Sequence, residues 1–156
     1  MRLIFKRSDG SVAIGMFLDG VDPAEEMAKY NQSVTGAPAI SVRQATIEDS
    51  PPPGWDGSKS DRTFREAWTD EVAGPQIDVD MPKARTIHMD RIREKRNAKL
   101  TELDLAYMIA DENGDNPSKA AIAQQKKVLR DLPGSYDLSG HTSPDTLKDD
   151  WPTEVE

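Results

Sequence analysis

Residues 80–133 carry the pattern that most constrains the fold of this chain. Asp80 can accept backbone N–H groups as a helix N-cap, and Pro82 falls in the first turn, where its missing N–H costs nothing. Apolar residues then recur at intervals of three and four, interrupted only by Arg96, which predicts one face of a long helix. The residues of this face are Met89, Ile92, Leu100, Leu103, Tyr107 and Ala110.

A tight turn and a second helix are expected to follow. Gly114 suits a C-cap, because glycine takes the left-handed conformation without steric cost. Asn116–Pro117 reads as the cap and first position of the next helix, and Pro133–Gly134 is expected to end it. The short connection predicts antiparallel helices that cover each other, with a third surface covering both. The second apolar face comprises Ala121, Ile122, Gln125, Val128, Leu129 and Leu132.

Residues 1–49 predict a small β-rich module. The apolar segments of Arg2–Phe17 flank Ser8–Gly10, whose Asp-Gly pair suits the turn of a β-hairpin. Asp22 is placed to cap a short helix that continues to about Asn31. A further strand at Ala39–Arg43 would complete a three-stranded sheet, with the helix on one face.

Residues 50–80 are interpreted as a linker followed by an anchor segment. Three consecutive prolines, Pro51–Pro53, favour an extended polyproline II conformation. Trp55 either packs on the nearest surface or serves as an aromatic anchor for a partner, and Phe64 and Trp68 follow in a short segment rich in such anchors. A short strand is expected at Gln76–Asp80.

The C-terminal region, residues 81–156, is expected to hold the helical hairpin and one short further helix. Ser143 and Pro144 suit the cap and first position of that helix, which would carry Leu147 inward before Trp151. The last four residues, 153–156, are expected to be frayed. The predicted fold class is therefore α+β, with a three-stranded module, a proline-rich linker and an antiparallel helical hairpin.

Composition restricts the classes of function. Only 36% of the residues are hydrophobic, with three each of Phe, Tyr and Trp, so the core should be thin and stabilised by docking on a partner. A net charge of −8 disfavours general binding to nucleic acid or to anionic membranes. The absence of cysteine excludes disulfides and thiolate chemistry. We expect no signal peptide and no membrane span, because the apolar run at Leu3–Phe5 is short.

No pattern of catalytic or ligand-binding residues stands out. His88 and His141 are far apart in sequence, and neither has a second imidazole at helical spacing, so His88 is interpreted as a half-exposed packing residue. The acidic run Asp111–Asn116 lacks the glycine and glutamate of an EF-hand loop and is interpreted as a capping loop. Nucleophile and phosphate-binding motifs are lacking. The prediction is a protein without enzymatic activity, metal or cofactor.

A run of basic residues along the first half of the long helix leaves three interpretations open. It can be a solvated face with internal pairs, a surface for an acidic protein partner, or a face laid along nucleic acid, and the net charge disfavours the last. The positive charges lie near the helix N-terminus, where the macrodipole disfavours them, so an acidic group should compensate. The run comprises Lys83, Arg85, Arg91, Arg93, Lys95, Arg96 and Lys99.

Several segments resemble small proteins encoded by tailed bacteriophages and prophages near their tail-fibre genes. They are Asp61–Trp68, Val79–Arg93 and Lys126–Pro133, with Leu147 and Trp151–Pro152 closing the pattern. The Leu-Arg-Asp-Leu-Pro sequence followed by Trp-Pro is also similar to the C-terminal part of tail-fibre assembly proteins. The resemblance extends over nearly the whole chain.

The resemblance implies a non-enzymatic assembly or accessory protein that binds a tail fibre or another tail protein through amphipathic helices and aromatic anchors. It places the protein in the host cytoplasm during assembly or in the virion tail, and a homo-oligomer is a further option. The alternatives are a structural subunit of the tail or baseplate and a regulatory hairpin that acts on a host factor or nucleic acid. The residues expected to bind a partner are Trp55, Phe64, Trp68, Met89, Ile92, Leu100, Leu103, Tyr107, Val128, Leu129 and Trp151.

Overall fold

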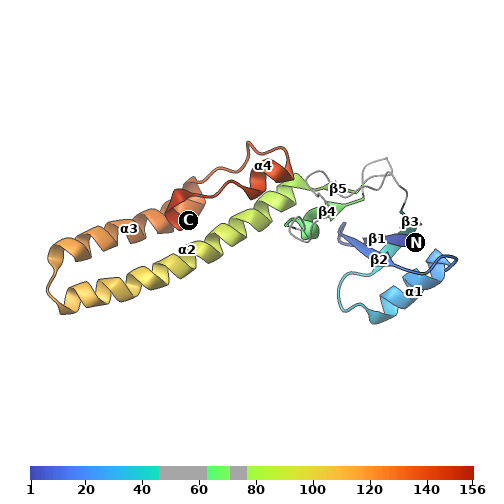
Figure 1. Ribbon diagram of the computed structural model, residues 1–156, viewed down its shortest axis with the longest axis horizontal. Helices are drawn as coiled ribbons and strands as arrows, with labels where there is room; N and C mark the ends of the chain where they lie inside the picture. The colour runs from blue at the N-terminus through green and yellow to red at the C-terminus, as the bar shows by residue number, and fades with distance from the viewer. Residues whose placement is uncertain (46–62, 71–76) are drawn as a thin grey trace. The chain divides into compact units, whose positions relative to one another are not determined.

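A computed structural model describes residues 1–45, 63–70 and 77–156, and the chain forms two compact units, Met1–Ala84 and Arg85–Glu156 (Figure 1). The first unit contains a three-stranded antiparallel sheet, and the second contains most of a long helical hairpin. The predicted α+β class is therefore confirmed. The proline-rich linker and Trp55 lie outside the described residues.

The sheet of the first unit is built around its first strand. Strand β1 (Arg2–Arg7) lies between β2 (Val12–Met16) and β3 (Ala39–Gln44), and both pairings are antiparallel. The turn between β1 and β2 contains Gly10 at a φ of 79°, a left-handed conformation that suits glycine. The pairing with β3 shifts register between Lys6 and Arg7. The predicted hairpin and third strand are thus confirmed.

Helix α1 (Pro23–Ser33) supplies the apolar layer on one face of this sheet. Its N-terminus is capped as predicted, since the Asp22 carboxylate accepts the backbone N–H of Ala24 at 2.9 Å. Tyr30 stacks on Phe5 with ring centroids 4.9 Å apart, and Phe5 belongs to the buried core of the sheet.

The segment that holds Phe64 and Trp68 forms local structure that the sequence pattern did not predict. A 3-10 turn, η2 (Arg65–Ala67), leads into β4 (Trp68–Thr69). This strand pairs with β5 (Asp78–Val79), which lies within the strand expected at Gln76–Asp80. An ion pair connects this ribbon to the three-stranded sheet, because Arg43 of β3 binds Asp70 with its Nη2 2.6 Å from Oδ1 and its Nε 3.0 Å from Oδ2.

Helix α2 (Met81–Glu112) begins and ends as expected. The Asp80 carboxylate accepts the backbone N–H of Lys83 at 3.1 Å, and Gly114 has a φ of +68° in the turn that follows. Helix α3 (Asn116–Ser135) is capped one residue earlier than predicted, because the Asp115 carboxylate reaches the backbone N–H of Ser118 at 3.1 Å.

The prediction that Pro133 ends α3 is wrong. Pro133 lies inside the helix, which continues to Ser135. A proline has no N–H to donate to the carbonyl four residues earlier, but its fixed φ is compatible with the helix, so near the C-terminus one lost bond is tolerated. The end is closed instead by the N–H of Tyr136, which donates to the Leu132 carbonyl at 2.9 Å.

After α3, the chain returns toward the start of unit 2 along α2 (Figure 1). Helix α4 (Pro144–Lys148) is capped by Ser143, and Leu147 is fully buried, as predicted. The expectation of a frayed end is wrong, because η3 (Thr153–Val155) buries Val155 to 7% exposure. The apolar side chain of Val155 stabilises a terminus that its charged neighbours alone would leave in water.

Two leucines of unit 2 provide a matched test of where its core lies. Replacing buried Leu147 with Ala should lower the free energy of unfolding by about 2–5 kcal/mol, since it leaves a cavity. The same change at Leu105, which is 61% exposed, should alter it by less than about 0.5 kcal/mol. Urea unfolding of both variants measures the difference, and equal effects would contradict the assignment of the core.

Candidate functional site

The apolar face predicted for α2 is covered unequally along its length. In the first half, Ile92 is fully buried, and Met89 is half-buried. In the second half, Leu100, Leu103 and Tyr107 are only half-buried, although Ala110 near the end is 7% exposed. The stripe therefore forms the interior of the hairpin, and less of it is buried where α3 alone covers it.

Charged contacts on both sides of Tyr107 hold the distal part of the hairpin together. Lys119 and Lys126 of α3 lie over the Tyr107 ring, with their Nζ atoms 5.4 and 5.1 Å from its centroid. The same lysines pair with Asp111 and Asp104 of α2. The hydrogen bond to Asp111 raises the pKa of Lys119. Exposed ion pairs contribute little to the free energy of unfolding. The stability of this end of the hairpin therefore depends mainly on its few buried apolar side chains.

Three large apolar side chains project into solvent from the opposite face of distal α2. Leu105, Met108 and Ile109 are 61%, 58% and 50% exposed, and their spacing of three and four places them side by side on one face. We call these three residues the distal ridge. Sequence reasoning missed them because it followed the longer stripe through Leu103 and Tyr107. The spacing of the three residues was the available signal.

The predicted partner-binding residues are divided by their exposure. Phe64 and Trp68 are 4% and 7% exposed and belong to the core around β4, so the expectation that they are exposed anchors is corrected. Ile92 and Leu129 are likewise buried inside the second unit. Val128 of α3 is 41% exposed and remains available for a contact. Trp55 lies outside the described residues.

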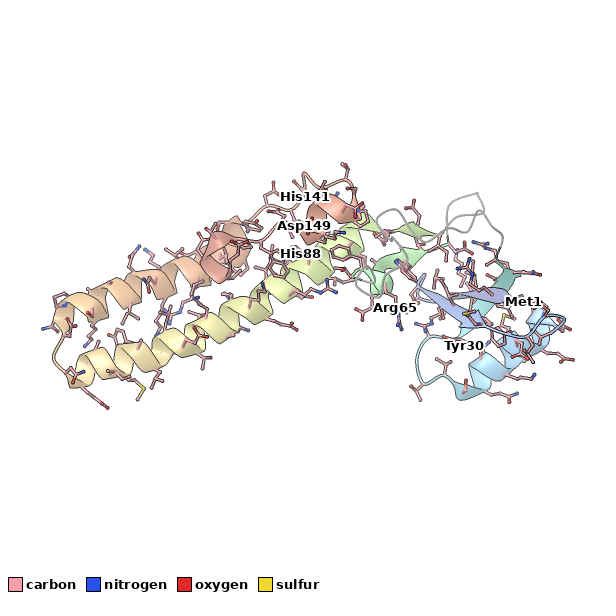
Figure 2. All side chains as sticks on the ribbon, viewed as in Figure 1. Met1, Tyr30, Arg65, His88, His141 and Asp149 are labelled. Carbon is pink, nitrogen blue, oxygen red and sulfur yellow. The ribbon has the colours of Figure 1, made fainter. Side chains whose placement is uncertain are left out.

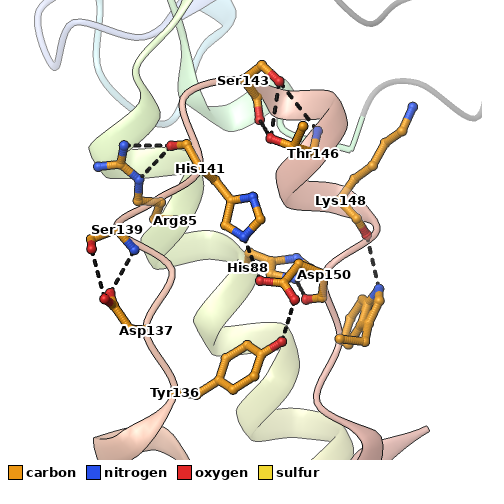
Figure 3. Close-up of polar contacts among 11 residues, drawn as sticks. Arg85, His88, Tyr136, Asp137, Ser139, His141, Ser143, Thr146, Lys148 and Asp150 are labelled. Carbon is orange, nitrogen blue, oxygen red and sulfur yellow. Dashed lines mark hydrogen bonds and ion pairs between the residues drawn. The ribbon is translucent and has the colours of Figure 1, made fainter.

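The two histidines, distant in sequence, meet in a polar cluster between α2 and the C-terminal segment (Figures 2 and 3). Asp150 is its centre. Its carboxylate accepts the Tyr136 hydroxyl at 2.5 Å and lies 2.6 Å from His141 Nε2, while its backbone carbonyl lies 2.8 Å from His88 Nε2. We call Tyr136, His141, Asp150, His88 and Trp151 the C-terminal clamp.

Trp151 completes the clamp through contacts with His88, Lys95 and Lys148. Its ring lies edge-on to His88 with centroids 4.7 Å apart, and the Lys95 ammonium sits 3.9 Å from its centroid. The indole N–H donates to the Lys148 carbonyl at 3.0 Å. Trp151 is half-buried, and its ring and its N–H both make contacts within the chain, while its role in binding a partner stays a prediction.

Part of the basic run on α2 is used inside the chain as well. The Arg85 guanidinium donates to the His141 carbonyl at 2.7 and 3.2 Å, and Arg93 pairs with Asp90 at 2.6 Å. With Lys95 on Trp151, these contacts supply compensation for positive charge near the helix N-terminus. They favour the interpretation of an internally paired face for the residues that make them.

Burial and hydrogen bonding shift the pKa values of the clamp. Burial lowers the pKa of His88, which is fully buried rather than half-exposed as expected from the sequence. The hydrogen bond from Tyr136 lowers the pKa of Asp150, and burial raises the pKa of Tyr136 to about 12. At neutral pH, the clamp thus contains an ionised Asp150 held by a protonated tyrosine and a neutral His88.

The clamp brings together histidine, aspartate and tyrosine, which are residue types used in acid–base catalysis. Its contacts, however, are made between these residues and the chain's own backbone and side chains. His88 binds a backbone carbonyl, and the Asp150 carboxylate is occupied by Tyr136 and His141. Across residues 1–45, 63–70 and 77–156, no three side chains of His, Asp or Glu are grouped so that they could hold a metal ion. We interpret the clamp as the feature that fixes the C-terminal segment to α2.

Comparisons with known protein families, with curated proteins and with solved structures found no match. No helix in the described part of the chain is long and apolar enough to cross a membrane. The distal ridge and Val128 are exposed apolar side chains of the hairpin, and they form the candidate docking surface.

The buried His88 predicts a loss of stability in mild acid. The pKa of His88 is lowered below the ordinary 6.5 in the folded state. Between these two pKa values the unfolded chain binds more protons than the folded chain, so the free energy of unfolding falls as the pH drops below 6.5. Urea unfolding at about pH 7.5 and pH 5.5 should show this fall, and His88→Gln should reduce it. An NMR titration that placed the His88 pKa at 6.5 or above would contradict the prediction.

Tyr136 predicts a second loss of stability in alkali. Its pKa is raised from 10.0 to about 12, so in this interval the folded chain keeps a proton that the unfolded chain releases, and stability falls as the pH rises. Ultraviolet absorbance titrations of the wild type and of Tyr136→Phe should differ by one phenol that titrates near pH 12. A difference curve centred on 10.0 would show that Tyr136 is not held by the clamp.

Proposed function

We propose that this chain is a non-enzymatic assembly or accessory protein of bacteriophage tail fibres and that it binds the fibre through the distal ridge. The observation that carries the proposal is the exposure of Leu105, Met108 and Ile109 on one face of a long helix. A contiguous apolar group of this kind on a folded unit is typical of a contact surface.

The shape of the surface favours an elongated partner. The ridge has the i, i+3, i+4 spacing by which amphipathic helices engage each other, and it lies on a helix that is about 48 Å long at 1.5 Å per residue. Val128 on α3 adds a fourth exposed large apolar side chain to the hairpin. A fibre chain with an apolar stripe would cover the ridge during trimerisation or remain on it in the virion.

The link to tail fibres specifically comes from the sequence resemblance. The segments Val79–Arg93 and Lys126–Pro133 that carry it form the start of α2 and the second half of α3. Within the described residues, the side chains of the clamp are used in contacts that fold the chain. A protein that acts by binding a partner is consistent with this use. The proposed place of action is the host cytoplasm during assembly, or the virion tail.

A pull-down with the fibre protein encoded next to this chain tests the proposal. Coexpressed wild-type protein should form a complex with the fibre, and Leu105→Ser/Met108→Ser/Ile109→Ser should reduce its yield at least about tenfold, since burial of each side chain contributes more than 1 kcal/mol. Met16→Ser/Leu18→Ser, at two side chains that are each 84% exposed in the first unit, is the matched control and should bind normally.

Two results would contradict the proposal. One is a wild-type chain that ignores the fibre, and the other is a triple variant that binds as well as the control. Mass spectrometry of purified particles then separates two forms of the function. A stoichiometric copy in the virion indicates a structural subunit, whereas absence from the virion indicates an assembly factor.

A further inference from the structure

An acidic side chain lies at each end of the distal ridge, on the same face of α2. Glu102 lies three residues before Leu105, and Glu112 lies three residues after Ile109, so helical spacing places both in line with the ridge. Both glutamates are exposed. Along about 15 Å of helix, this face therefore presents an acid, the apolar ridge and a second acid.

These two glutamates differ from the other acidic residues of distal α2, which are used inside the hairpin. Asp104 and Asp111 each pair with a lysine of α3. Among the described residues, neither Glu102 nor Glu112 forms an ion pair. The negative charge of the two glutamates is therefore available to a partner that covers the ridge.

The part of α2 around the ridge has no positive charge of its own. Residues 101–112 contain four acidic side chains and no Lys or Arg. Lys99 is the nearest basic residue before this stretch, and it lies about 120° around the helix from Leu105. The ridge is also close to the C-terminal end of α2, where the helix macrodipole is negative and the last turn has no basic residue. Such a surface favours a partner that brings positive charge.

We propose that the occupant of the distal ridge is a basic amphipathic helix, whose apolar side chains cover the ridge while Lys or Arg side chains pair with Glu102 and Glu112. This partner chemistry rests on the proposed function, because it describes the fibre segment that would bind at the same surface. A helix that lies along α2 can place its side chains between those of the ridge. Its basic residues would lie about ten positions apart, with the apolar stripe between them.

The glutamates could have a different role, which is to keep an exposed apolar ridge soluble. Charged residues that flank apolar side chains oppose non-specific association. This role needs no basic partner, and it predicts that peptides with the same apolar stripe bind equally whatever their charge. A charge preference of the ridge therefore separates the two roles.

Fluorescence anisotropy of three labelled peptides with the isolated full chain tests the preference. The peptides have about 18 residues and one apolar stripe in common, and the positions on both sides of the stripe hold Lys, Gln or Glu. The Lys peptide should bind with a dissociation constant of about 10–100 μM, at least about tenfold more tightly than the Glu peptide, with the Gln peptide between them. Equal affinities, or no binding of any peptide, would overturn the proposal.

Charge reversal tests whether the preference belongs to the ridge. Glu102→Lys/Glu112→Lys should bind the Lys peptide at least about tenfold more weakly and should prefer the Glu peptide, whose binding also shows that the variant is folded. Glu25→Lys/Asp131→Lys is the matched control, because it changes the net charge equally at exposed acidic residues of α1 and α3. The control should keep the wild-type preference. A ridge variant that keeps the preference, or a control that loses it, would overturn the proposal.

The peptide measurements use no fibre, so their failure is distinguishable from failure of the proposed function. Leu105→Ser/Met108→Ser/Ile109→Ser should weaken binding of the Lys peptide at least about tenfold, which assigns the contact to the ridge. If the Lys peptide binds there and the fibre pull-down fails, the basic partner stands and the fibre is the wrong partner. If the fibre binds through the ridge and the peptides show no preference, the proposed function stands and the basic partner is wrong.

Discussion

In a pair of antiparallel helices, each helix buries only the face that it turns toward the other, and this constraint governs the second unit of the molecule. Each helix of such a pair keeps most of its surface in water unless a further layer is added. The chain adds that layer at one end only, where residues 136–156 return along α2 and where Leu147, Val155 and Ile92 are buried. At the other end α3 is the only neighbour of α2 within the second unit, and large apolar side chains remain exposed.

The C-terminal clamp is what makes this added layer possible. Irregular backbone that covers a helix needs partners for its polar groups, and the side chains of α2 provide them. His88 binds the Asp150 carbonyl, and Arg85 binds the His141 carbonyl. In this view the two histidines have roles in folding, and part of the positive charge on α2 is used to hold a segment that carries Asp137, Asp145 and Asp150. The clamp depends on neutral His88 and ionised Asp150, which explains why its stability should depend on pH.

Elements with strong local signals could be predicted from the sequence, and those that depend on distant partners could not. Asp22, Asp80 and Ser143 cap helices through neighbours within four residues, so their roles follow from local sequence. The clamp joins His88 to Asp150 across 62 positions, and no periodic pattern encodes such a contact. Phe64 and Trp68 were predicted to bind a partner because their short segment is rich in aromatic anchors, whereas both side chains are buried and the Arg43–Asp70 ion pair joins that segment to the sheet.

The distal ridge was missed for a different reason. Periodicity identifies the face of a helix that faces the interior, and the longest apolar series on this helix is the one that runs through Leu103 and Tyr107. Leu105, Met108 and Ile109 form a shorter apolar series at the same spacing, and only their measured exposure shows that this series faces solvent.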